Sequence, residues 1–153
     1  MTKTITIIRE MDYFFVDIFE KQKELDTRIY AQSQPRNLFK KKDYQANIDE
    51  YKKLKNLALK INPSGYDPDP EDENLLELIV SFEEVLAVYN MYCDRGIAVQ
   101  ELLRRKAEGD KYKHSLYSEA ADKQRAAAAL FQTKMNDFNA EYSEYKEMMA
   151  EEV

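Results

Sequence analysis

Residues 117–149, YSEAADKQRAAAALFQTKMNDFNAEYSEYKEMM, decide the fold class. One set of positions in this stretch steps by four residues and then by three without interruption, and only Gln124 in the set is polar. This spacing places the whole set on one stripe of a single long α-helix, the pattern of a helix packed lengthwise against others. The positions are Tyr117, Ala121, Gln124, Ala128, Phe131, Met135, Phe138, Tyr142, Tyr145 and Met149.

Apolar residues recur with the same period in earlier segments, which predicts further amphipathic helices. Long helices joined by short turns favour antiparallel neighbours. We therefore predict one all-α domain over 1–153, an elongated up-down-up-down bundle of four main helices with coiled-coil-like seams. The predicted helices cover about 6–31, 42–61, 70–108 and 113–150.

The clearest loop lies between the second and third predicted helices. Residues 62–70 contain three prolines and a glycine, which exclude a regular element. At its end, Asp69 is expected to cap the third helix, with Pro70 at the first helical position.

Gly96 interrupts the third predicted helix and indicates a kink or a break, because a mid-helix glycine costs about 1 kcal/mol relative to alanine. The third and fourth helices would each exceed about 50 Å, whereas the second would be about 30 Å long. Either the third helix folds back at Gly96, or the last hairpin projects and leaves seam residues uncovered. Uncovered seam residues favour a partner chain, so we expect a homodimer. The expected partner-helix contacts are Phe131, Met135, Phe138, Tyr142, Tyr145 and Met149.

The composition is that of one ordinary globular domain, with 153 residues, 44% of them hydrophobic and 34% charged. Cys93 is the only cysteine, so an intramolecular disulfide is excluded, which suits a reducing compartment. The N-terminal apolar run is too short for a signal peptide. No stretch approaches the roughly 18 apolar residues of a membrane span. We predict a cytoplasmic protein with no membrane partner.

Charge is segregated along the chain, although the overall net charge is −6. Residues 1–61 and 104–125 are net basic, whereas 62–103 and 126–153 are net acidic. An antiparallel bundle would collect basic turns at one end and acidic segments at the other. The acidic end would hold Asp67, Asp69, Glu71, Asp72, Glu73, Glu147, Glu151 and Glu152. The basic end is a candidate anion or nucleic-acid site formed by Arg36, Lys40, Lys41, Lys42, Arg104, Arg105, Lys106, Lys111 and Lys113.

Few residues could carry catalysis or hold a cofactor. His114 is the only histidine, which excludes two-histidine metal sites, and it is expected to be a solvated turn residue. Cys93 lies on an apolar seam and is expected to be a buried, unreactive thiol. Glycine-rich phosphate loops are absent, and the acids before the third helix fit capping better than a calcium loop. We predict no catalytic, cofactor-binding or metal-binding residue, and no cofactor.

The predicted function is that of a non-catalytic interaction, adaptor or assembly protein that acts through its surfaces and self-associates. One alternative is a nucleic-acid accessory protein that uses the basic end, where Phe39 and Tyr112 accompany the cations. Another is an acidic helical inhibitor of a nucleic-acid-binding protein. The polar seam residue Gln124 is expected to fix helix register, with Gln22 as its partner.

Overall fold

The computed structural model describes residues 2–66 and 70–151, and within them the chain is an all-α bundle without strands, as predicted. Helix α1 continues through a π-helical segment, η1, into α2, and together they form the first predicted helix. Short 3-10 turns, η2 and η3, flank α3. The elements are α1 Thr2–Tyr13, η1 Phe14–Phe19, α2 Glu20–Gln32, η2 Pro35–Asn37, α3 Tyr44–Leu59, η3 Pro63–Gly65, α4 Glu73–Ala107 and α5 His114–Glu151.

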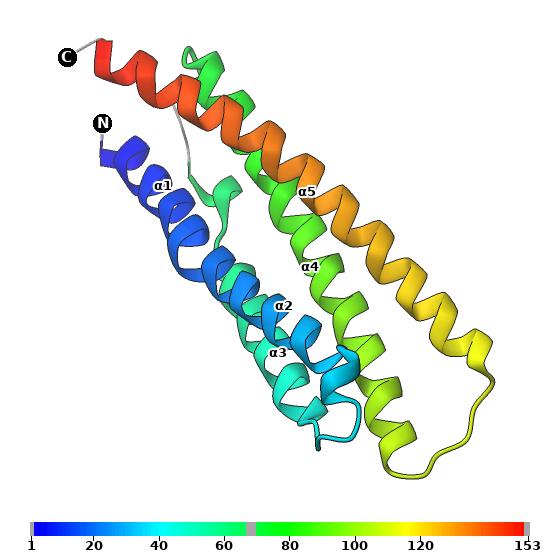
Figure 1. Cartoon of the computed structure of the whole chain (residues 1–153). Coiled ribbons are helices and arrows are strands. Elements are labelled where there is room, and N and C mark those ends of the chain that lie inside the picture. The colour runs from blue at the N-terminus through cyan, green and yellow to red at the C-terminus, as the bar shows by residue number, and fades with distance from the viewer. Residues whose placement is uncertain (1, 67–69, 152–153) are drawn as a thin grey trace.

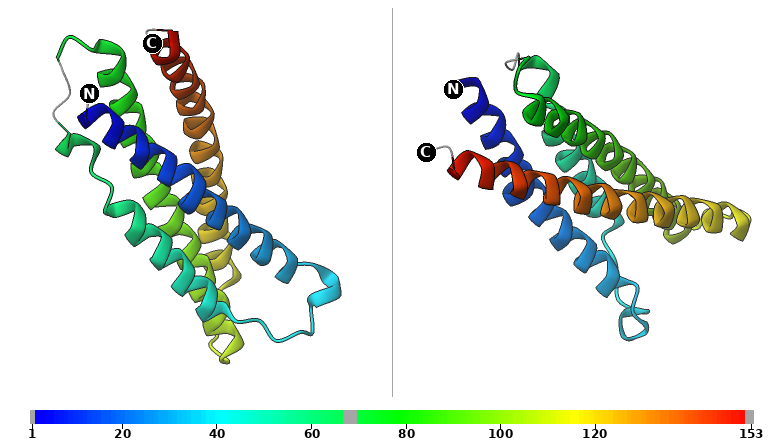
Figure 2. Two further views of the ribbon diagram at one scale, coloured as in Figure 1. Left: turned by 90° about the vertical axis from the view of Figure 1, so that its left-hand side faces the viewer. Right: turned by 90° about the horizontal axis from the view of Figure 1, so that it is seen from above.

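Successive helical rods run antiparallel (Figure 1). The long α4 and α5 form a hairpin, and α3 packs along α4. The start of α1 and the end of α5 lie at the same end of the bundle. From there the α1–α2 rod crosses α5 and diverges from it toward the opposite end (Figure 2). The first half of α5 therefore lies beside α4 but away from α2.

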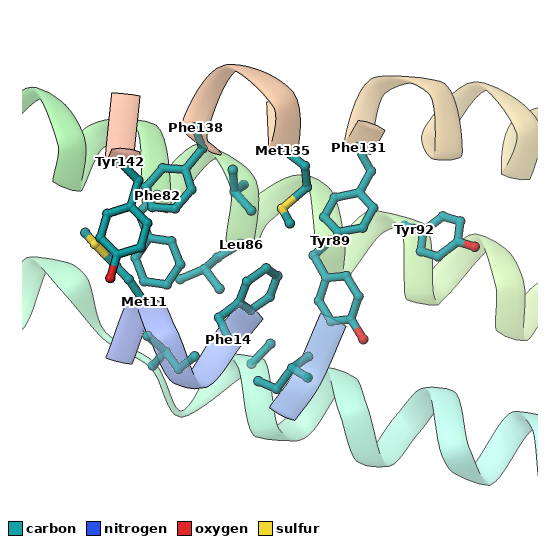
Figure 3. Close-up of a cluster of buried hydrophobic side chains, with 14 of the residues drawn as sticks. Met11, Phe14, Phe82, Leu86, Tyr89, Tyr92, Phe131, Met135, Phe138 and Tyr142 are labelled. Atoms are coloured by element: carbon teal, nitrogen blue, oxygen red, sulfur yellow. The ribbon is translucent and has the colours of Figure 1, made fainter. Parts of the chain in front are cut away.

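The core is centred where the α1–α2 rod crosses the α4–α5 hairpin (Figure 3). Phe138 has no exposed surface, and its ring lies 5.2 Å from Phe82 and 5.5 Å from Phe15 between ring centroids. The π-helical segment presents two successive rings to different helices. Phe14 contacts Phe82 and Tyr89 on α4, while Phe15 stacks on the α5 rings. This aromatic layer joins three rods into one core.

Helix α4 begins at Glu73, so the prediction that placed Pro70 at its first helical position was wrong. Asp72 is the N-cap, and its Oδ1 accepts a hydrogen bond from the Leu75 backbone N–H at 3.1 Å. Its other carboxylate oxygen accepts from the Tyr145 hydroxyl at 3.1 Å, so a contact with α5 helps fix the start of α4. The predicted cap, Asp69, lies outside the described residues.

Helix α4 is continuous through Gly96, which excludes the alternative in which the helix folds back there. The glycine instead lets α3 approach closely. A Cβ placed at Gly96 would lie 2.3 Å from Cζ of Tyr51, a fully buried residue of α3. A side chain at position 96 would therefore collide with the Tyr51 ring.

The predicted pairing of Gln22 with Gln124 was also wrong. Gln22 is buried and accepts a hydrogen bond from the Tyr89 hydroxyl at 2.8 Å, and its Nε2 donates to Asp26 at 2.8 Å. Gln124 Nε2 donates to the Tyr51 hydroxyl at 3.2 Å. Because α2 diverges from this part of α5, the two glutamines bond to tyrosines on α4 and α3 instead.

Candidate anion-binding end

The α2–α3 and α4–α5 turns lie at the same end of the bundle (Figure 1). Arg104 connects the two regions, since its Nη1 donates to Gln45 Oε1 at the start of α3 at 2.5 Å. Buried Asn47 on α3 connects this helix to α2 and α4, because its Nδ2 donates to Gln32 Oε1 and to Gln100 Oε1, each at 2.8 Å. We call residues 36–42 and 104–114 the basic end. All nine predicted anion-site residues fall in it.

The α2–α3 turn has a defined backbone. Pro35 begins the 3-10 turn, and the Asn37 side chain donates to the Ala31 carbonyl at 2.6 Å, which caps the end of α2. The backbone N–H groups of Leu38 and Lys40 each donate to a carbonyl three residues earlier, at 3.1 Å. These hydrogen bonds connect the turn to itself and to the end of α2.

The tip of this turn carries two exposed apolar side chains, Leu38 and Phe39. Phe39 is 98% exposed and Leu38 is 64% exposed. Large apolar side chains are more often buried than exposed, so this turn displays two neighbouring apolar side chains to solvent.

Three lysines follow this apolar pair and stand just before α3, whose N-cap is Asp43. The N-terminus of a helix carries positive partial charge, so Lys40, Lys41 and Lys42 are placed where the helix dipole disfavours them. Lys42 donates to the Leu38 carbonyl at 3.4 Å. The α3 helix therefore gains no dipole stabilisation from this lysine run.

The α4–α5 turn is built around Gly109, which has φ of 94°, the left-handed conformation that favours glycine. The N–H groups of Gly109 and Asp110 donate to the carbonyls of Lys106 and Arg105, at 3.1 and 2.9 Å, and terminate α4 in a Schellman motif. Arg105 also pairs with the Asp110 carboxylate at 2.8 Å, and this partner raises the pKa of the guanidinium.

Aromatic side chains pack onto this turn. The Arg105 guanidinium lies 5.5 Å from the centre of the Tyr112 ring, and the Tyr112 hydroxyl donates to the Leu102 carbonyl at 2.7 Å. Burial raises the pKa of Tyr112 above its ordinary value. His114, the first residue of α5, is exposed and its ring lies 6.1 Å from that of Tyr117.

A hollow of about 410 Å³ lies against the α4–α5 turn. Its walls combine basic and aromatic side chains with one carboxylate that is already paired with Arg105. The lining residues are Leu103, Lys106, Asp110, Lys111, Tyr112, His114 and Tyr117. Such a mixture suits a ligand that carries negative charge.

Most cations of the basic end lack an acidic partner among the described residues. Arg104 and Arg105 face Glu108 and Asp110, at 3.9 and 2.8 Å. In residues 2–66 and 70–151 no ion pair involves the other predicted site residues. Those residues are Arg36, Lys40, Lys41, Lys42, Lys106, Lys111 and Lys113.

The opposite end gathers acidic side chains, as the charge pattern predicted for the residues that are described. Carboxylates from the start of α4 line a hollow of about 450 Å³ together with residues from the end of α5, among them Tyr145 and Met148. Asp67, Asp69 and Glu152 lie outside the described residues. The acids placed here are Glu71, Asp72 and Glu73, with Glu147 and Glu151 near the end of α5.

The predicted partner-helix residues lie inside the chain's own core. Five of the six are buried, and only Met149 is partly exposed. They pack against α1, η1 and α4, so they are not available on the surface for a partner helix. The six residues are Phe131, Met135, Phe138, Tyr142, Tyr145 and Met149.

Within the described part of the chain, no group of three or more histidine, cysteine, aspartate or glutamate side chains could hold a metal ion. None of the helices described there combines the length and the apolar character needed to cross a membrane. No protein-family model, curated protein or solved structure matches the chain.

Cys93 is fully buried beside Tyr89, and burial raises the pKa of its thiol to about 12. Because the thiolate is the reactive form, we expect the native protein to react with an aromatic disulfide reagent roughly a hundredfold more slowly than the unfolded chain. Absorbance during labelling, with and without guanidinium chloride, measures both rates. Equal rates would show that the thiol is accessible and that this part of the core is open.

Proposed function

We propose that this protein is a non-catalytic interaction protein that binds an anionic partner through its basic end. The observation that carries the proposal is the position of the lysines. Lys40, Lys41 and Lys42 precede the N-terminus of α3, and Lys111 and Lys113 precede that of α5, where the helix dipoles disfavour cations. These residues do not stabilise the helices that follow them, and no ion pair within residues 2–66 and 70–151 involves them, so they can bind an external anion.

The hollow supports the same proposal. Lys106 and Lys111 are among its lining residues, and its single carboxylate, Asp110, is paired with Arg105. An anion at this position would meet cations and hydrogen-bond donors rather than uncompensated acids. The acidic residues that give the chain its net charge of −6 are concentrated elsewhere, including the far end of the bundle.

A matched pair of charge reversals tests the proposal. Lys40→Glu with Lys41→Glu changes the basic end, and Lys52→Glu with Lys53→Glu makes the same charge change on an exposed part of α3. Heparin serves as a general polyanion. We expect wild-type binding to weaken with salt, and the first double variant to bind about tenfold more weakly, because close cations dominate binding to a polyanion.

The control double variant should lose less than about threefold. The basic-end variant should also be as stable as wild type or a few tenths of a kcal/mol more stable, because the dipole favours acids before α3. Calorimetric titration across a salt series and chemical denaturation measure the two quantities. Equal loss of heparin affinity in both double variants would refute a localised site.

Single-stranded nucleic acid is the second candidate partner, and the ring-lined hollow favours it. However, Tyr112 is already covered by Arg105 and Tyr117 is only partly exposed, which leaves His114 as the exposed ring there. Self-association remains a separate prediction, which sedimentation of the full chain tests.

A further inference from the structure

We infer that the anionic partner of the basic end is a lipid bilayer surface, with Leu38 and Phe39 inserted among the lipid headgroups. This inference rests on the proposed function and names the partner. The observation behind it is an exposed apolar pair flanked by cations on one short turn.

The side chains of Leu38 and Phe39 are exposed to solvent. Phe39 is 98% exposed and Leu38 is 64% exposed, although both are large apolar side chains. Backbone hydrogen bonds link residues within this turn, and the Asn37 side chain donates to the Ala31 carbonyl at the end of α2 at 2.6 Å. Because the turn is already ordered, insertion would cost little additional conformational entropy.

The flanking residues supply the attraction to anionic headgroups. Arg36 precedes the apolar pair, and Lys40, Lys41 and Lys42 follow it directly. Clustered lysine and arginine side chains beside an anionic bilayer are attracted to its negative surface potential, while an aromatic side chain enters the interface. The same seven-residue segment provides both contributions.

A protein partner fits this turn less well. Two apolar side chains form a patch much smaller than the roughly 800 Å² per partner of a stable protein interface. Lysine is also depleted at the centres of such interfaces. A bilayer needs no complementary shape, so a small apolar tip surrounded by lysines is sufficient.

A nucleic acid also fits less well. A base could stack on Phe39, but Leu38 offers no aromatic face for a second base. Neither Leu38 nor Phe39 lines the ring-lined hollow at the α4–α5 turn. The exposed pair therefore favours an apolar interface over a strand of bases.

The charge polarity of the bundle is compatible with a surface that approaches from one end. Helix α4 has 35 residues and therefore separates the acidic and basic ends by about 50 Å. This length exceeds the Debye length of about 8 Å at physiological salt, so the acidic end would not oppose the approach of the basic end.

The inference differs from the sequence-based expectation of no membrane partner. That expectation rested on the absence of a spanning segment, and no helix in the described residues could span. The exposure of Leu38 and Phe39 is a property of the folded turn.

A tryptophan reporter tests insertion directly, because the chain contains no tryptophan. We would introduce Phe39→Trp into the full chain and, as a control, Leu59→Trp, which replaces a 55% exposed side chain at the far end of α3. Vesicles of phosphatidylserine mixed with phosphatidylcholine should shift the emission of Phe39→Trp to the blue, and brominated lipid should quench it. Leu59→Trp should show neither change.

Vesicle sedimentation with the otherwise wild-type chain completes the test. Phe39→Ala should bind the mixed vesicles about tenfold more weakly, since most of one aromatic transfer free energy is lost. Vesicles of phosphatidylcholine alone should bind little protein. Salt-sensitive binding to the mixed vesicles without an emission change in Phe39→Trp would overturn insertion.

The outcomes also separate this inference from the proposed function. Binding to heparin or to a single-stranded oligonucleotide, without binding to the mixed vesicles, would overturn the lipid inference and leave the proposed function standing. Failure to bind any of the three probes would overturn both.

Discussion

Phe138→Ala should lower the free energy of unfolding by about 3–5 kcal/mol, the range for removing a fully buried aromatic side chain. Phe138 has no exposed surface, and its ring contacts rings on η1, on α4 and on its own helix, α5. Its centroid lies 5.2 Å from Phe82 on α4, 5.5 Å from Phe15 on η1 and 5.5 Å from Tyr142 on its own helix. The substitution removes contacts that join three rods.

Phe39→Ala is the matched control, because it makes the same chemical change at a 98% exposed position. It should change the free energy of unfolding by less than about 0.5 kcal/mol. Urea denaturation followed by circular dichroism measures both variants. A similar small loss at both positions would contradict the described core, and a large loss at Phe39 would mean that this side chain is covered in solution.

Gly96→Ala should destabilise the protein by about 1–2 kcal/mol, although alanine is the better helix former. The new Cβ would lie 2.3 Å from Cζ and 2.6 Å from the hydroxyl oxygen of Tyr51. Tyr51 is fully buried and its hydroxyl accepts a hydrogen bond from Gln124, so the ring has little room to move. Overpacking at this contact should outweigh the gain in helix propensity of about 1 kcal/mol.

A double-mutant cycle with Tyr51→Leu isolates this collision. Tyr51→Leu alone should destabilise the protein through the lost ring, but in its background Gly96→Ala should be neutral or stabilising. The expected coupling between positions 51 and 96 is at least about 1 kcal/mol. If Gly96→Ala is stabilising in the wild-type background, the close approach of α3 to α4 is wrong.

The period of the apolar residues was sufficient to predict the helices, but it could not identify their neighbours. The stripe on α5 is buried from Phe131 to Tyr145, yet Tyr117 and Ala121 on the same stripe are only partly buried. The difference arises because α2 diverges from the first half of α5. Divergence of this kind depends on packing between rods, which the spacing within one helix does not encode.

Gly96 and Asp72 show the same limit at single residues. A lone glycine in a helical pattern fits either a kink or a close approach, and the deciding ring, Tyr51, belongs to another helix. The sequence pattern predicts Asp69 as the cap of α4, whereas the observed cap is Asp72, which also accepts a hydrogen bond from Tyr145 on α5. In both cases a tertiary contact selects between local alternatives.

The basic end was predictable from charge blocks and antiparallel topology, because both are properties of the chain order. The exposure of Leu38 and Phe39 at its tip could not be predicted from the sequence. Phe39 is followed by three lysines in the sequence, but an aromatic residue is more often buried than 98% exposed. The ring-lined hollow likewise depends on the Schellman turn at Gly109, which directs the chain back onto α4.

Amide chemical-shift mapping during titration with a heparin oligosaccharide tests the central claim, namely that this bundle acts through its basic end, most directly. The account predicts that shift changes concentrate at residues 33–43 and 103–117, and that the buried stretch 131–145 and the acidic end are unaffected. Changes centred on 131–149 or on the start of α4, with none in the two basic turns, would contradict it.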